Sequence, residues 1–197
     1  MTLTMDSVDQ PVTIPNEKLM TAENQVEIHR PVTAQLKAAP DARAITDGEI
    51  VLATLDIAAA PERVFRALTT DEAERWWGAP DVYAIESWKA DLRVGGTWSL
   101  IIRLPDGTAL PASGEFLQVE APKRLVQTRR YDWDHPTLGR RVTKVTYLLE
   151  PSELGTRVTV RHEDFGSSEP AYEHAGGWER FLDFLGVYLA REQGSGT

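Results

Sequence analysis

The sequence of 197 residues contains no cysteine. A disulfide framework, a thiolate metal site and a thiol nucleophile are therefore excluded, and the stability of the fold must come from packing. Basic residues are also in deficit, because 21 lysines and arginines face 30 aspartates and glutamates, which gives a net charge of −9. A nucleic-acid binder normally carries a basic face, so we do not expect nucleic acid as a partner.

Long apolar runs and the common cofactor motifs are missing as well. No apolar stretch approaches the roughly 18 residues that a membrane span needs, and residues 1–10 hold two aspartates and no secretory pattern. We therefore expect a cytoplasmic protein without a membrane partner. The four histidines lack metal-ligand spacing, and neither a phosphate loop nor a nucleophile elbow occurs. The sequence predicts no metal, no cofactor and no assignable catalytic residue.

Aromatic residues are absent from the first third of the chain. No tryptophan, tyrosine or phenylalanine precedes Phe65, and four prolines interrupt residues 1–48. Such a segment buries little apolar surface. We predict a partly ordered arm over residues 1–48, a folded domain over residues 49–191 and a disordered tail over residues 192–197.

Within the domain the pattern predicts an α+β fold. An aliphatic run over residues 49–57 indicates a strand, and two short helices follow it, the first opened by Pro61. Alternation between residues 83 and 164 predicts an antiparallel meander, with strands over residues 97–104, 114–120, 125–131, 141–150 and 156–164. Residues 168–191 are apolar at helical spacing. This long helix is expected to cover the curved sheet as a helix grip.

Six tryptophans are the most prominent feature that is present, two of them adjacent at residues 76 and 77. Each indole buries a large apolar area and carries one N–H that needs an acceptor. Large side chains between a sheet and a single helix either fill the space or line it. The predicted apolar walls of a binding site are Trp76, Trp88, Trp98, Tyr147, Trp178 and Phe181.

Polar groups on the expected inner face of the sheet complete this predicted site. Alternation places His162 on the same face as Val160, so the imidazole points inward if the valine does. A core histidine bonded to a neighbour is the simpler explanation of that position. Arg129 shares a strand face with Leu125, and a buried guanidinium needs an acidic partner or an anionic ligand. Glu115 and Glu163 are the candidate partners.

The connection over residues 131–139 is long and holds Trp133 and His135. Long connections between strands often carry function. This one is either a lid over the mouth of the cavity or a solvent-exposed loop anchored by a single indole.

A set of short motifs occurs in a defined order. They are Pro61-x-x-Val64-Phe65-x-Ala67-Leu68-Thr69, Trp76-Trp77-Gly78, Asp91-Leu92-Arg93-x-Gly95-Gly96-x-Trp98, Pro105-Asp106-Gly107, Gly155-Thr156-Arg157-Val158-Thr159-Val160 and Gly177-Trp178. In this order the chain resembles the START-like (SRPBCC) superfamily, and within it the Aha-type group named after activators of the heat-shock chaperone ATPase. The resemblance implies a helix-grip fold with a cavity between the sheet and the long helix. Related domains can pair, so a homodimer is a possible state.

The favoured function is the non-enzymatic binding of a small hydrophobic or aromatic molecule in that cavity, by a carrier, sensor or sequestration protein. His162 and Arg129 would orient a polar group of the ligand. One alternative is a polyketide cyclase or hydrolase that uses the same cavity, with His162 as acid or base near Asp164. The other is a co-chaperone-like module that contacts a chaperone through exposed strands or its acidic surface. A shared fold does not decide among these tasks.

Overall fold

A computed structural model describes residues 41–79 and 81–194. The predicted arm up to residue 40 and the tail from residue 195 lie outside the described residues. The elements in chain order are β1 (Arg43–Asp47), β2 (Ile50–Ile57), α2 (Pro61–Thr69), α3 (Ala73–Trp76), β3 (Gly78–Ala79), β4 (Tyr83–Ala90), β5 (Thr97–Arg103), β6 (Ala109–Glu120), β7 (Arg124–Tyr131), β8 (Thr143–Pro151), β9 (Thr156–Glu163) and α4 (Ser168–Gly194).

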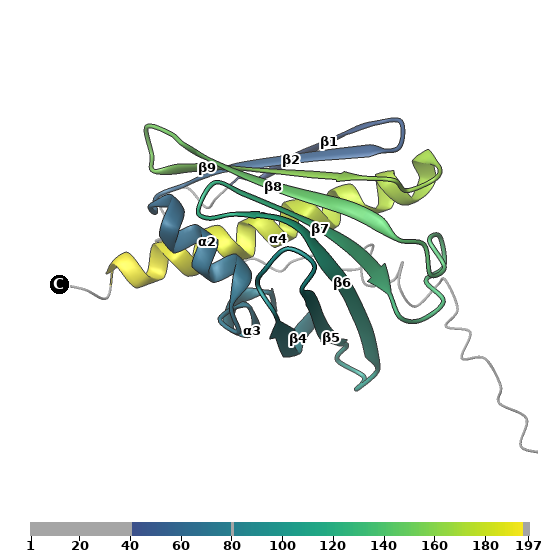
Figure 1. Ribbon diagram of the computed structural model, residues 1–197. Coiled ribbons are helices and arrows are strands. Elements are labelled where there is room, and N and C mark those ends of the chain that lie inside the picture. The colour runs from purple at the N-terminus through teal and green to yellow at the C-terminus, as the bar shows by residue number, and fades with distance from the viewer. Residues whose placement is uncertain (1–40, 80, 195–197) are drawn as a thin grey trace, which may run out of the picture. The chain divides into compact units, whose positions relative to one another are not determined.

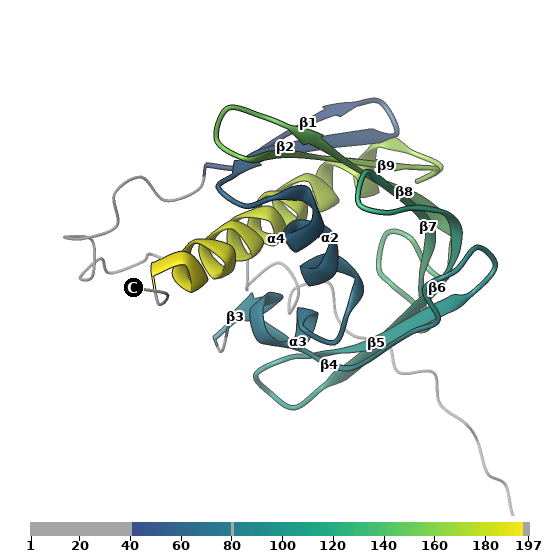
Figure 2. The ribbon, with the colours of Figure 1, turned by 60° about the vertical axis from the view of Figure 1, so that its left-hand side comes forward.

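The strands form one nine-stranded antiparallel sheet in the order β1-β2-β9-β8-β7-β6-β5-β4-β3. The sheet curves, and α4 runs along its concave side while α2 and α3 lie between the two ends of the curve (Figures 1 and 2). Curvature is needed because a single helix covers the apolar face only where the sheet wraps toward it. The predicted helix-grip fold is confirmed.

Side-chain alternation explains how the strands share one core. In β9 the residues alternate between buried and more exposed positions, and Val158, Val160 and His162 are fully buried. His162 pairs with Val51 of β2 and Val145 of β8, both also fully buried. A period of two places all these side chains on the concave face. The expectation that His162 points inward with its valine neighbours is therefore correct.

The domain is longer at both ends than the sequence predicted. Strand β1 lies inside the segment assigned to the arm and pairs with β2, so the predicted boundary at residue 49 falls within a hairpin. Helix α4 continues beyond Arg191 to Gly194, and Glu192 forms an ion pair with Arg63 of α2. That contact fixes the last turn of the helix to the rest of the domain.

The outer edge of β1 is closed by carboxylates of α4. The amide of Ala42 donates to Asp183 at 3.0 Å, and the amide of Ala44 donates to Glu179 at 2.8 Å. An exposed strand edge offers its N–H groups to other chains unless something covers them. These two side chains occupy that hydrogen-bonding row, so the β1 edge is not open to a second strand at these positions.

Replacing Asp183 with alanine is expected to loosen β1. The lost hydrogen bond should cost about 1 kcal/mol of the unfolding free energy, because the amide of Ala42 is left without its acceptor. Hydrogen exchange at residues 42–46 should become faster while exchange in β8 and β9 stays unchanged. Replacement of the exposed Asp81 with alanine is the matched control. Unaltered exchange of the β1 amides in Asp183→Ala would contradict the edge-closing role.

None of the helices in the described part of the chain combines the length and the apolar character that crossing a membrane requires.

Candidate functional site

Aromatic rings from three elements pack together where α3 meets α4. Phe181 of α4 lies with its ring centroid 5.1 Å from Trp76, 4.8 Å from Trp77 and 5.1 Å from Trp178, in edge-to-face contacts. Tyr147 of β8 joins them 6.0 Å from Trp178. Edge-to-face contacts at these distances are favourable. Four predicted wall residues, Trp76, Tyr147, Trp178 and Phe181, are thus brought into one cluster and are all buried.

The other two predicted wall residues form a separate pair on the neighbouring strands. Trp88 of β4 stacks on Trp98 of β5 at 6.1 Å. The indole N–H of Trp98 donates to the carbonyl of Thr128 at 3.1 Å, whereas the half-buried Trp88 has a buried Nε1 without an acceptor. The predicted set therefore occupies two places on the concave face.

Arg129 of β7 lies on this face inside a cage of aromatic rings. Its guanidinium carbon is 5.7 Å from the ring centroid of Trp77, 5.3 Å from Tyr131 and 5.9 Å from Trp178. The side chain is only 8 % exposed. Contact with ring faces stabilises a cation that has lost water. We call these three rings the aromatic cage of Arg129.

The acidic partner expected for Arg129 is not present among the described residues. Glu163 is paired with Lys144 and Arg161, and Glu115 is exposed. The one hydrogen bond of the Arg129 guanidinium is a long contact of 3.4 Å from Nη2 to the Tyr131 hydroxyl, and its buried Nε has no partner. Neither of the two proposed acids is paired with Arg129, so within the described part of the chain the buried arginine keeps an uncompensated charge.

His162 is held by hydrogen bonds at both ring nitrogens. The indole N–H of Trp178 donates to Nδ1 at 3.0 Å, which makes Nδ1 an acceptor and places the proton of the neutral ring on Nε2. Nε2 then donates to the Thr143 hydroxyl at 2.8 Å, and this hydroxyl donates to the carbonyl of Arg129 at 3.0 Å. The simpler explanation, a core histidine satisfied by its neighbours, describes this geometry.

A second chain of hydrogen bonds runs from Arg129 to α4. The Tyr131 hydroxyl lies 3.1 Å from Nε2 of His174, and Nδ1 of His174 lies 2.8 Å from the carbonyl of Pro170. A carbonyl only accepts, so Nδ1 carries the proton and Nε2 accepts from the tyrosine. The tyrosine oxygen is then oriented to accept from Arg129. Both chains of hydrogen bonds therefore end at Arg129, one at its backbone carbonyl and the other at its guanidinium.

Three histidines around Arg129 are kept neutral by this environment. Burial and the charge of Arg129 lower the pKa of His135 to about 4. Burial and the same charge lower the pKa of His174 to about 3. Burial, His174 and Arg129 hold the pKa of His162 well below its usual range. No group of three or more His, Asp or Glu side chains in residues 41–79 and 81–194 is placed to hold a metal ion.

The connection after β7 lies against the same cluster. Trp133 is half-buried with its ring 5.6 Å from Tyr131, and His135 stacks on Tyr131 at 4.5 Å. Thr137 donates a hydrogen bond to Glu173, which ties the connection to α4. The Nε1 atom of Trp133 is buried without an acceptor. This segment thus brings a second unsatisfied N–H donor to the Arg129 region.

Sequence reasoning did not select two members of this cluster, Tyr131 and His174, for the predicted site. Tyr131 shares a strand face with Arg129 at a spacing of two, which was a usable signal. His174 precedes Trp178 by four residues on α4, so both lie on one helix face. Trp77 was expected among the rings of the interior, but its contact with Arg129 could not be predicted from the pattern, because it caps a four-residue helix.

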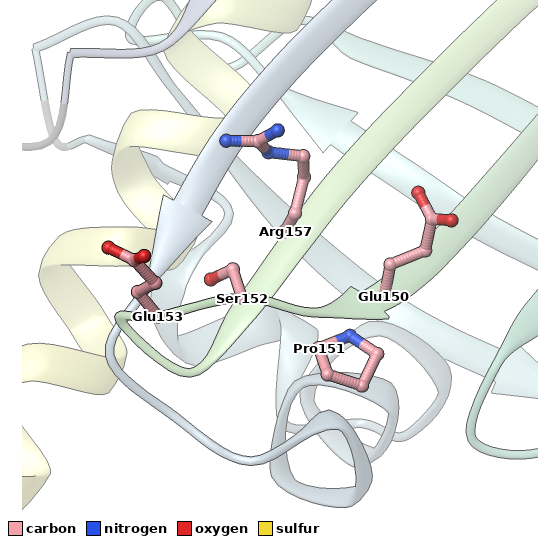
Figure 3. Close-up of a pocket in the computed structure, with 5 residues that line it drawn as sticks. All are labelled: Glu150, Pro151, Ser152, Glu153 and Arg157. Carbon is pink, nitrogen blue, oxygen red and sulfur yellow. The ribbon is translucent and has the colours of Figure 1, made fainter.

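Two hollows lined by described residues lie away from Arg129. One of about 780 Å³ adjoins the β8–β9 turn and is lined by Glu150, Pro151, Ser152, Glu153 and Arg157 (Figure 3). Arg157 there is already bound to Asp56 through Nε and Nη2, at 3.0 and 2.7 Å. The other, of about 340 Å³, includes Thr128, Arg130 and the predicted wall residue Trp98. Both are open to solvent. Neither is lined by the group that we call the arginine cluster, which consists of Arg129, its aromatic cage of Trp77, Tyr131 and Trp178, and Trp133, His135, His162 and His174.

Comparison with solved structures supports the helix-grip fold. Solved structures of similar fold include a protein from Rhodobacter sphaeroides. It is 22 % identical over 77 % of this chain and 99 % of its own, with a TM-score of 0.65. A protein from Nitrosomonas europaea is 27 % identical over 74 % of this chain and 96 % of its own, with a TM-score of 0.60. An AHSA1-like protein from Aeromonas hydrophila is 25 % identical over 73 % and 94 %, also with a TM-score of 0.60.

No curated protein matches the chain at a significant level. Residues 58–190 match the family model described as activator of Hsp90 ATPase homolog 1-like protein. This range runs from the end of β2 through almost all of α4, so it includes every side chain of the arginine cluster. The chain therefore belongs to the family of activator of Hsp90 ATPase homolog 1-like proteins.

Proposed function

We propose that the protein binds a small hydrophobic or aromatic molecule between the sheet and α4, next to Arg129. One observation carries the proposal: within the part of the chain that the structure describes, Arg129 and Trp133 each hold a buried N–H donor without an acceptor, at Nε and Nε1, in a region otherwise built of aromatic rings. Buried donors without acceptors are rare and costly in native proteins. A ligand that brings acceptor oxygens into this region would satisfy them.

The packing of the rings narrows where such a molecule would lie. Phe181 packs against both Trp76 and Trp178. On the side of α2 and α3, these side chains therefore fill the space between one another. The side that faces Tyr131 and Trp133 carries the unsatisfied donors. Membership in a family associated with a ligand-binding cavity is consistent with this position. Predominantly apolar sites with a few polar groups are typical of small-molecule binding.

An enzymatic use of His162 receives no support from its surroundings. Both ring nitrogens are engaged, and Asp164 lies largely exposed with its carboxylate 3.9 Å from Lys144. A general acid or base needs a nitrogen that can reach the substrate. We therefore retain the binding function and place His162 among the residues that hold Arg129 and Trp178.

A neutral fluorescent probe tests this proposal. N-phenyl-1-naphthylamine brightens in apolar surroundings, and we expect a saturable increase in its emission with one probe bound per chain. Trp133→Ala should weaken the binding about tenfold, because the indole closes the ligand side of the cluster. Tyr172→Ala, which removes a ring that is 78 % exposed on α4, is the matched control and should bind as the parent does.

Two results would count against the proposal in different ways. A complete lack of saturable probe binding by the folded parent would reject binding of an aromatic molecule at this site. Equal affinities of Trp133→Ala and the parent would instead exclude the lid role of the segment after β7. The thermal unfolding temperature of each variant shows whether a change in affinity reflects a loss of fold.

A further inference from the structure

The charge at the centre of the arginine cluster has no counter-ion among the described residues. An arginine remains protonated in proteins, so burial does not neutralise it. Aromatic faces and one long contact to a hydroxyl replace only a part of its lost hydration. In the protein without ligand, this arrangement is therefore costly.

Among residues 41–79 and 81–194, the titratable groups whose charges interact with that of Arg129 do not supply a negative charge. They are Tyr131 on β7, Tyr147 on β8, Tyr83 on β4, His162 on β9, His174 on α4 and His135 in the connection after β7. Burial raises the pKa of Tyr147 well above its usual range, although Arg129 opposes this rise. Tyrosines and neutral histidines thus surround a single full positive charge.

The Nε and Nη2 edge of the Arg129 guanidinium has a defined chemical preference. Two other arginines of this chain show what this edge binds: Arg157 holds Asp56, and Arg103 holds Glu86, in both cases through Nε and Nη2. The same two nitrogens of Arg129 are the ones with no partner and with only a 3.4 Å contact. Two parallel N–H donors match the two oxygens of a carboxylate.

We propose that the molecule bound at this site is an aromatic monocarboxylate, with its carboxylate on the Nε and Nη2 edge of Arg129 and its ring against Trp133 and the aromatic cage. This inference rests on the proposed function, because it assigns a chemical class to the ligand of the same site. A monoanion fits because it balances one positive charge. A dianion would leave a buried negative charge with no partner.

A pair of probes that differ only in charge tests the assignment. Calorimetric titration at pH 7.5 compares 1-naphthaleneacetate with 1-naphthaleneacetamide, which keeps the ring and replaces the carboxylate with a neutral amide. We expect the carboxylate to bind about tenfold more tightly or better, since its hydrogen bonds to Arg129 are charge-assisted. Equal affinities would overturn the monocarboxylate proposal and leave the binding function standing. No binding of either probe would contradict both.

Variants of two adjacent arginines separate the site from the general charge of the protein. Arg129→Met keeps an unbranched apolar stem and removes the guanidinium with its charge, so the carboxylate should lose its advantage over the amide. Arg130→Met changes an exposed arginine on the opposite face, paired with Asp132, and should keep that advantage. A preference that survives in Arg129→Met would overturn the proposal.

A measurement on the unmodified chain covers the case in which Arg129→Met does not fold. The side-chain Nε–H signals of arginine can be followed by nitrogen-15 NMR during each titration. Saturation with 1-naphthaleneacetate should shift one buried Nε–H proton signal strongly downfield, as a new charge-assisted hydrogen bond does, and the amide should not. The absence of any carboxylate-specific shift would reject Arg129 as the anchor.

Discussion

Acidification from pH 7 to pH 5 is expected to lower the unfolding free energy by about 4 kcal/mol. The cause lies in the three neutral histidines beside Arg129. In the folded protein their pKa values are lowered, to about 4 for His135, to about 3 for His174 and well below the usual range for His162. In the unfolded chain each titrates near its ordinary value of about 6.5.

The sign of this change in unfolding free energy follows from proton uptake by the unfolded chain. Between pH 6.5 and the folded pKa values, the unfolded chain binds protons that the folded chain does not, so acid favours unfolding. The stabilising contribution is complete above pH 6.5 and is lost as the pH falls through that value toward 4 and 3. Each histidine contributes about 1.4 kcal/mol per pH unit at full effect, and we expect less from the half-buried His174.

Urea unfolding followed by tryptophan fluorescence at pH 7, 6 and 5 measures this loss. The variant His174→Gln removes the smallest of the three contributions, so the difference between pH 7 and pH 5 should shrink by less than about a third. An unfolding free energy that stays constant from pH 7 to pH 5 would contradict the buried neutral state of these rings. Since native stabilities are commonly about 5–15 kcal/mol, the expected loss is a large fraction of the total.

On the proposed function, the arginine cluster balances stability against binding. His162, Thr143 and Trp178 are fully satisfied and rigid, and they hold the backbone and one wall of the site. Arg129 at their centre is left with a buried donor and a bare charge. Functional groups of this kind commonly persist at a cost in stability. On the proposed function, the ligand itself would relieve that cost.

Most of the fold could be predicted because its strands follow the simple period of two. The segments assigned to β7, β8 and β9 agree with the structure within a few residues, and so does α4. Strand β4 was missed because its register breaks between Glu86 and Lys89, with Ser87 at a φ of 56°, which disrupts alternation. The first part of β6 was missed because Pro111 in a strand argues against that assignment.

The candidate site could be predicted only in part, because its members come together through tertiary packing. Arg129 and His162 were found from strand alternation, which is a local signal. The partners of Arg129 were not, since Glu163 is engaged by Lys144 and Arg161 and Glu115 is exposed. Trp77 and His174 reach the cluster from α3 and α4, so their proximity depends on how both helices dock against the curved sheet.

Gly114→Ala is expected to destabilise the protein by about 3 kcal/mol or more, although it adds one methyl group. A Cβ at this position of β6 would lie 1.9 Å from the carbonyl oxygen of Thr128 and 2.5 Å from Nε1 of Trp98. Trp98 reaches across this glycine to donate its indole N–H to that carbonyl. The methyl group would therefore separate β6 from β7 and break the hydrogen bond of the indole.

The same substitution elsewhere in the chain gives a control of opposite sign. Gly177 of α4 has open space where a Cβ would be, so Gly177→Ala should raise the unfolding free energy by about 0.5–1 kcal/mol through its better helix propensity. Thermal and urea unfolding of both variants measure the two effects. A Gly114→Ala protein as stable as the parent would mean that β6 and β7 can move apart beneath Trp98. The strand that carries Arg129 would then be too loosely held to keep a cation at a fixed place among its aromatic neighbours.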